Sequence, residues 1–138
     1  MNRFETLLAW YATLDPPALE RLAEFYHPQA RFKDPFNDVQ GLAAIRRVFE
    51  HMFATTQGPR FVIREELADA HRAFVTWEFE CGLRGRRVIV HGATRFGFDL
   101  DGLVTEHRDY WDPAEELWQK LPLIGAPVGW PRRRFKAI

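Results

Sequence analysis

The sequence predicts an α+β domain in which helices pack on one face of a curved antiparallel sheet. Up to about residue 56, apolar residues recur three and four positions apart, which is the spacing of amphipathic helices. From Pro59 onward the spacing changes to two, the period of strands, in four long runs. A block of helices followed by a meander of strands is typical of this class.

Two helical segments open the chain. The first covers about 2–14, where Asn2 and Glu5 form the pattern of a capping box. The second begins at Asp15, because an Asp followed by prolines is a common helix start. Its apolar stripe reaches Tyr26, and the pair His27-Pro28 ends it, since proline disfavours helix in the residue before it.

A short strand and a third helix follow. Phe32 lies in the strand, and Gly41 precedes an amphipathic helix over 42–56. The four alternating runs then span 60–69, 72–83, 86–99 and 103–111. Asp112 and Pro113 start a short helix through Leu117 and Lys120. We expect one domain over 1–138, with its core in about 1–115 and the short helix and a basic aromatic tail in 113–138.

Composition argues against several kinds of function. Nineteen Lys and Arg balance nineteen Asp and Glu, so no basic surface for nucleic acid is expected. Cys81 is the only cysteine, which excludes an internal disulfide and a Cys-rich metal site. The histidines lack metal-ligand spacing and no glycine-rich phosphate loop occurs, so we expect neither metal nor cofactor. Without an export signal or a long apolar segment, the expected location is the cytoplasm.

An inward-facing carboxylate is the first candidate for chemistry. In "ARFKDPF", residues 30–36, Ala30, Phe32 and Asp34 alternate with two basic residues. A strand that buries Phe32 therefore turns Asp34 the same way. The alternative is local, because Asp34 precedes Pro35 and its carboxylate can accept nearby amides in an Asx turn.

The last alternating run supplies two more candidates. Its two faces are Leu103, Thr105, His107, Asp109 and Trp111, and Val104, Glu106, Arg108 and Tyr110. Because Glu106 and Arg108 suit water, we expect the first face to lie against the helices. His107 and Asp109 then bind each other or a ligand, and the alternative is a buried pair with a purely structural role. Asp112 is expected to be a helix cap.

Aromatic residues are numerous enough to line a cavity as well as to fill a core. The chain has five Trp and twelve Phe. Trp77, Phe79 and Cys81 share one face of their strand, and Cys81 is expected to be a small buried hydrophobe rather than a nucleophile. The expected substrate-binding residues are Trp10, Tyr11, Tyr26, Val48, Trp77, Phe79 and Trp111.

These residues and the order of the elements resemble a known family. The segments "FYHPQARFKDPFNDVQGLAAIRRVF" and "TRFGFDLDGLVTEHRDYWD" are similar to the nuclear transport factor 2-like superfamily, which includes ketosteroid isomerase and the SnoaL-like polyketide cyclases. The resemblance implies a cone-shaped fold (a cystatin-like roll), in which the curved sheet wraps three helices and encloses a pocket. It also implies a homodimer formed through the outer face of the sheet.

The resemblance also assigns roles to residues. "KDPF" matches the segment with the general-base aspartate of ketosteroid isomerase, which carries that role to Asp34. The two oxyanion donors of the isomerase align with Trp10 and with Gly92, which has no side chain. His107 and Asp109 are similar to the acid/base pair of the SnoaL-like cyclases. "RDYWD" also resembles the closing motif of limonene-epoxide hydrolase, which needs an Arg and a second carboxylate, for which Arg95 and Asp34 are the available substitutes.

We therefore expect a cofactor-independent isomerase or cyclase that acts on an apolar, carbonyl-bearing small molecule. Asp34 or Asp109 is the expected base, and His107 orients Asp109 or returns the proton. The alternatives are a non-catalytic small-molecule or lipid-binding or dimerisation module and, third, an epoxide hydrolase. In the lipid-binding alternative, the tail with Arg132, Arg133 and Arg134 contacts a membrane surface; otherwise the tail is a solvated end.

Overall fold

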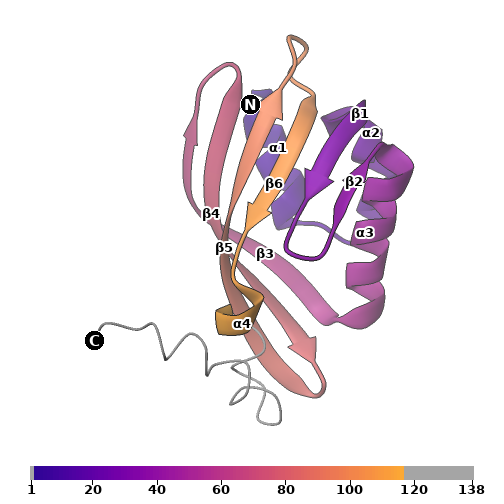
Figure 1. Cartoon of the computed structure of the whole chain (residues 1–138), viewed down its shortest axis with the longest axis vertical. Coiled ribbons are helices and arrows are strands. Elements are labelled where there is room, and N and C mark those ends of the chain that lie inside the picture. Colours follow the sequence, from indigo (N-terminus) through magenta and orange to yellow (C-terminus); the bar gives the residue numbers. More distant parts are fainter. Residues whose placement is uncertain (1, 117–138) are drawn as a thin grey trace.

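Six strands form one curved, unclosed sheet, and helices lie against one of its faces (Figure 1). The computed structural model describes residues 2–116. The strand order in the sheet is β2-β1-β6-β5-β4-β3. The predicted α+β class, with a curved sheet wrapped around helices, is confirmed.

Helix α1 (Arg3–Ala12) has the predicted start. Asn2 Oδ1 accepts the Glu5 backbone N–H at 2.8 Å, and the Asn2 backbone N–H donates to the Glu5 carboxylate at 3.0 Å, which completes the capping box. The helix buries one apolar face, which comprises Leu7, Leu8, Trp10 and Tyr11. That face packs over the sheet, where α1 contacts β3.

The second predicted helix is shorter than expected. Asp15 caps a 3-10 helix, η1 (Pro16–Arg21), and a single α-helical turn, α2 (Leu22–Phe25), follows it. Strand β1 (Tyr26–Lys33) begins directly afterwards, so the prediction that the helix includes Tyr26 is wrong. Pro28 lies inside β1, in the stretch where the register shifts against β6. Strand pairing there does not require the N–H that proline lacks.

A strand that the sequence did not reveal follows β1. Strand β2 (Asp38–Gln40) pairs with residues 31–33 and is too short to show an alternating pattern. Helix α3 (Leu42–Thr55) then begins after Gly41, as predicted, and buries Ile45 and Phe49. Helix α3 packs against β1 and β3 and so covers one side of the sheet's inner face.

Four long strands complete the sheet as predicted, close to the four alternating runs. They are β3 (Gln57–Ala68), β4 (Arg72–Leu83), β5 (Arg86–Phe98) and β6 (Val104–Tyr110). Their pairings are antiparallel, whereas β1 and β6 pair in parallel. The parallel pair follows from chain order, because β1 precedes the meander but lies beside its last strand.

The predicted faces of β6 are correct in part. His107 is buried and Glu106 is exposed, as expected. Val104, however, was expected on the outer face and is fully buried. The register between β5 and β6 shifts between Gly97 and Phe98, and such an irregularity breaks strict alternation along a strand.

The last described helix begins where the sequence predicts. Asp112 caps α4 (Pro113–Glu116) by accepting the Ala114 backbone N–H at 2.9 Å. The predicted continuation of this helix through Lys120, and the basic tail, lie outside the described residues. Within residues 2–116, none of the helices has the length and apolar character needed to cross a membrane.

Gly41 is required by the backbone at the start of α3. Its φ of 95° and ψ of 154° place it in a region that residues with a side chain avoid. We expect Gly41→Ala to lower the free energy of unfolding by about 1–3 kcal/mol. Gly97→Ala is the matched control, because Gly97 has no positive φ and an added Cβ would meet its neighbours at 3.5 Å or more. Urea unfolding of the two variants measures the difference, and equal midpoints would contradict this account.

Candidate active site

A cavity of about 270 Å³ lies between α3 and the inner face of the sheet. Apolar and aromatic side chains from α3, β1, β3, β4 and β5 line most of it. Two carboxylates also face it, Asp109 from β6 and Asp34 from the loop after β1. A largely apolar cavity with few polar groups is the usual form of a small-molecule site.

The structure separates the predicted substrate-binding residues into three groups. Val48, Trp77, Phe79 and Trp111 line the cavity. Tyr11 lines a deeper void of about 20 Å³, which Asp109 and His107 also border. Trp10 and Tyr26 line neither space. The Trp10 indole N–H donates to the Ala18 carbonyl at 2.9 Å, so the donor that the resemblance placed at Trp10 is not free for a ligand.

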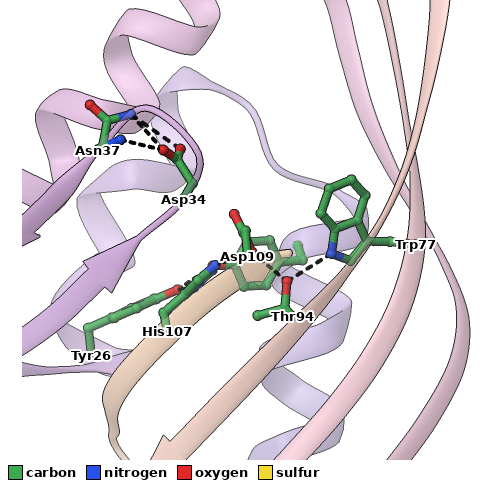
Figure 2. Close-up of polar contacts among 8 residues, drawn as sticks. Tyr26, Asp34, Asn37, Trp77, Thr94, His107 and Asp109 are labelled. Carbon is green, nitrogen blue, oxygen red and sulfur yellow. Dashed lines mark hydrogen bonds and ion pairs between the residues drawn. The ribbon is translucent and has the colours of Figure 1, made fainter. Parts of the chain in front are cut away.

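Asp109 is held through one of its two carboxylate oxygens. Oδ1 lies 2.7 Å from His107 Nε2 and accepts the Thr94 hydroxyl at 2.5 Å. The Thr94 hydroxyl in turn accepts the Trp77 indole N–H at 2.8 Å (Figure 2). Within the described part of the chain, Oδ2 has no hydrogen-bond partner, and Figure 2 shows it pointing away from His107 and Thr94. Oδ1 is therefore held by the protein, and Oδ2 is available to a ligand.

Two tyrosines hold the other side of the His107 ring. Nδ1 lies 2.6 Å from the Tyr26 hydroxyl and 3.1 Å from the Tyr11 hydroxyl, and the two hydroxyls hydrogen-bond to each other. Burial raises the pKa of both phenols well above the usual value, so both stay protonated. Each phenol has one hydrogen, so Tyr11 donates to the Tyr26 oxygen and Tyr26 donates to Nδ1. In this arrangement Nε2 carries the hydrogen that is donated to Asp109.

These contacts form one continuous series, which we call the polar chain. Its members, in order, are Tyr11, Tyr26, His107, Asp109, Thr94 and Trp77. The hydrogens donated from the Tyr11 end and from the Trp77 end of the polar chain both point toward Asp109 Oδ1. Sequence reasoning identified His107 and Asp109 as a pair but missed Thr94, although Thr94 lies directly across the β5–β6 pair from Asp109.

Asp34 is held by its own loop. Oδ1 accepts the backbone N–H groups of Phe36 at 2.8 Å and Asn37 at 2.6 Å, and the Asn37 side-chain amide lies 3.1 and 3.2 Å from the two oxygens. The local turn weighed from the sequence is therefore present. Figure 2 shows the Asp34 carboxylate directed to Asn37. Asp34 nevertheless lines the same cavity as Asp109, so both interpretations from the sequence describe part of its environment.

Comparison with known proteins identifies the family. The model of the SnoaL-like domain matches residues 7–107. The chain belongs to the SnoaL-like domain family. No curated protein sequence matches the chain.

Solved structures share the fold of this SnoaL-like domain at low sequence identity. A candidate SnoaL-like polyketide cyclase from Jannaschia sp. CCS1 is 19% identical with a TM-score of 0.74, over 91% of this chain and 92% of that one. TerC, crystallised with polyporic acid, is 23% identical with a TM-score of 0.71, over 82% and 93%. SalBIII, an epoxide hydrolase/cyclase-like enzyme, is 18% identical with a TM-score of 0.68, over 80% and 90%.

The SnoaL-like domain departs from the isomerase pattern at Gly92. Trp77 lies directly across the β4–β5 pair from Gly92, and a Cβ at position 92 would come within 2.3 Å of the Trp77 ring. The indole thus occupies the space beside the position that the resemblance aligned with a protonated aspartate. In residues 2–116, no three His, Cys, Asp or Glu side chains lie together as a metal site requires.

The polar chain predicts the tautomer of His107. We expect ¹⁵N NMR to find the hydrogen on Nε2 and none on Nδ1, because Tyr26 donates to Nδ1. Replacing both phenols, in Tyr11→Phe with Tyr26→Phe, leaves Nδ1 buried without a donor and lowers the free energy of unfolding by about 1–3 kcal/mol. A hydrogen on Nδ1 in the parent protein would contradict the assignment.

The two buried phenols also predict an alkaline transition. Their pKa values are raised in the folded state, so their contribution to stability is fully present below about pH 10 and is lost as the pH rises further. In Tyr110→Phe, which removes the remaining one of the three tyrosines, phenolate absorbance should appear only together with unfolding. Absorbance and circular dichroism measured during one titration test this, and phenolate in a folded protein would refute it.

Proposed function

We propose that this SnoaL-like domain is a cofactor-independent acid/base enzyme that removes a proton next to a carbonyl group in an apolar small molecule. The observation that carries the proposal is the asymmetric environment of Asp109. Two donors hold Oδ1, whereas Oδ2 has no partner in the described chain and Asp109 borders an aromatic cavity. A positioned carboxylate in an apolar site is a suitable general base.

Asp109 is a better base than Asp34 in this arrangement. The oxygens of Asp34 already accept three N–H groups from its own loop. A proton taken up by Asp34 would weaken those hydrogen bonds and the turn that they hold. Asp109 Oδ2 can take up a proton while both hydrogen bonds to Oδ1 remain.

The proposed proton transfer involves only the substrate and Asp109. Oδ2 takes the proton from carbon, the electrons of that bond form a C=C bond, and the carbonyl electrons move to oxygen as an enolate. Return of the proton to a different carbon gives isomerisation, and attack of the carbanion on a second carbonyl gives cyclisation. His107 donates from Nε2 throughout and acts as a positioning residue, because its contacts are Asp109 and the two phenols.

Epoxide opening has less support. The hydrolase-type arrangement needs an Arg beside the carboxylates, and Arg95 lies 3.2 Å from Glu106 in an ion pair. Among the described residues, no Arg lines the cavity. SalBIII is an epoxide hydrolase/cyclase-like enzyme with a role in pyran ring formation, and only the cyclisation half of that description suits the residues here.

Hydrogen exchange on 2-tetralone tests the proposed base. This flat aromatic ketone has acidic hydrogens beside its carbonyl, and their replacement by deuterium in D₂O is followed by NMR after subtraction of the buffer rate. We expect Asp109→Asn to lower the exchange rate by about 10²–10⁴-fold, since a general base is lost.

Two variants control for charge and location. Asp38→Asn removes a carboxylate that pairs with Arg31 outside the cavity and should leave the rate unchanged. Asp34→Asn should retain most of the activity, because the amide oxygen still accepts the loop N–H groups. Equal rates for the parent and Asp109→Asn, with both folded by circular dichroism, would reject the proposal.

A further inference from the structure

The proposed reaction needs a second polar group, and this inference rests on the proposed function. Removal of a proton next to a carbonyl places negative charge on the carbonyl oxygen. A hydrogen-bond donor must face that oxygen in the cavity. The described lining side chains with an N–H or O–H group are Asn37, His51, Thr55, Thr56, Trp77 and Trp111.

Four of these six donors already bind the protein. The Thr55 and Thr56 hydroxyls donate to the backbone carbonyls one turn earlier in α3, at 2.8 and 2.7 Å. The Asn37 amide donates to Asp34, and the Trp77 indole donates to Thr94. Use of the single hydrogen of Thr55, Thr56 or Trp77 by a substrate would break an existing hydrogen bond, which costs about 0.5–1.5 kcal/mol for a typical bond. The Asn37 amide is fixed in place by its hydrogen bond to Asp34.

Two lining side chains remain that have no hydrogen bond to the described residues. Neither the His51 imidazole nor the Trp111 indole hydrogen-bonds to another group within residues 2–116. An indole N–H can donate a hydrogen bond but cannot give up its proton in this pH range. An imidazole can do both, and the exposed position of His51 lets it exchange protons with solvent.

The position of His51 on α3 fits this role. Val48 precedes it by three residues and Thr55 follows it by four, so the three side chains share one face of the helix. All three line the cavity. Asp109 reaches the same cavity from β6, so a flat substrate between helix and sheet meets a carboxylate on one side and an imidazole on the other.

We propose that His51 is a second catalytic residue, whose ring N–H donates to the carbonyl oxygen while Asp109 Oδ2 removes the proton from carbon. When His51 gives its proton to the oxygen, the enolate becomes an enol, and the proton returns to His51 when the carbonyl re-forms. The substrate class is therefore a neutral ketone with its acidic C–H directed to the sheet and its oxygen directed to α3.

Hydrogen exchange on 2-tetralone tests the role of His51 separately from the role of Asp109. We expect His51→Leu to lower the rate by about 10²-fold, as the loss of one donor to a developing oxyanion does. His51→Gln should restore part of the rate, because its amide N–H can donate but cannot transfer a proton. His71→Gln is the matched control, since His71 lies in the turn between β3 and β4 and does not line the cavity.

A second measurement does not depend on turnover. 4-Nitrophenol resembles an enol, and its phenolate has a distinct visible absorbance. The measurement uses Asp109→Asn, because its neutral amide imitates the protonated carboxyl group. In this variant, hydrogen bonding from His51 should increase the fraction of the bound probe that is phenolate. Adding His51→Leu to this variant should decrease that fraction.

The outcomes distinguish the two proposals. Unchanged exchange in His51→Leu, together with an unchanged phenolate fraction in the double variant, would overturn the role of His51 even where Asp109→Asn abolishes exchange. Parent-like exchange in Asp109→Asn would instead overturn the proposed base. His51 is exposed on its helix, so loss of the imidazole is not expected to unfold the domain.

Discussion

The polar chain is the constraint on which the rest of the site depends. It links α1, β1, β6, β5 and β4 through six side chains, and most of these are buried in an apolar interior. A buried polar group without a partner costs about 1–3 kcal/mol, so each member is stable there only because its neighbours are present. The helix and four strands must therefore meet in one arrangement, and that arrangement fixes the orientation of Asp109.

The direction of the donors determines what Asp109 can do. Tyr26 donates to His107, which donates to Asp109, while Trp77 donates to Thr94, which donates to the same oxygen. With Oδ1 satisfied from both sides, Oδ2 is the acceptor left for a ligand. At Asp34, by contrast, N–H groups of its own loop lie within hydrogen-bond distance of both oxygens, which suits a structural carboxylate. The chemical difference between the two acids thus comes from their donors, because both line the same cavity.

Local signals in the sequence predicted much of this structure. The capping box at Asn2, the inward face of β4 and the His107–Asp109 pair each depend on residues a few positions apart, so spacing alone reveals them. The parallel pairing of β1 with β6 and the burial of Val104 depend on register between distant segments, which spacing does not record. The same limit applies to Tyr26, whose hydroxyl binds His107 from a strand 81 residues earlier in the chain instead of facing the cavity.

Trp77 connects the fold to the orientation of the substrate. Gly92 leaves room for the indole against β5, and the indole N–H is then used to hold Thr94 and, through it, Asp109. Filling this space with an aromatic ring removes the place where a side-chain donor from β5 would reach a ligand. The sheet side of the cavity therefore supplies a base and apolar surface. The ring N–H groups that have no partner in the described part of the chain come from α3 and from Trp111, which follows β6. A carbonyl oxygen is expected to turn away from Asp109 and toward those groups, because like charges repel and the donors lie there.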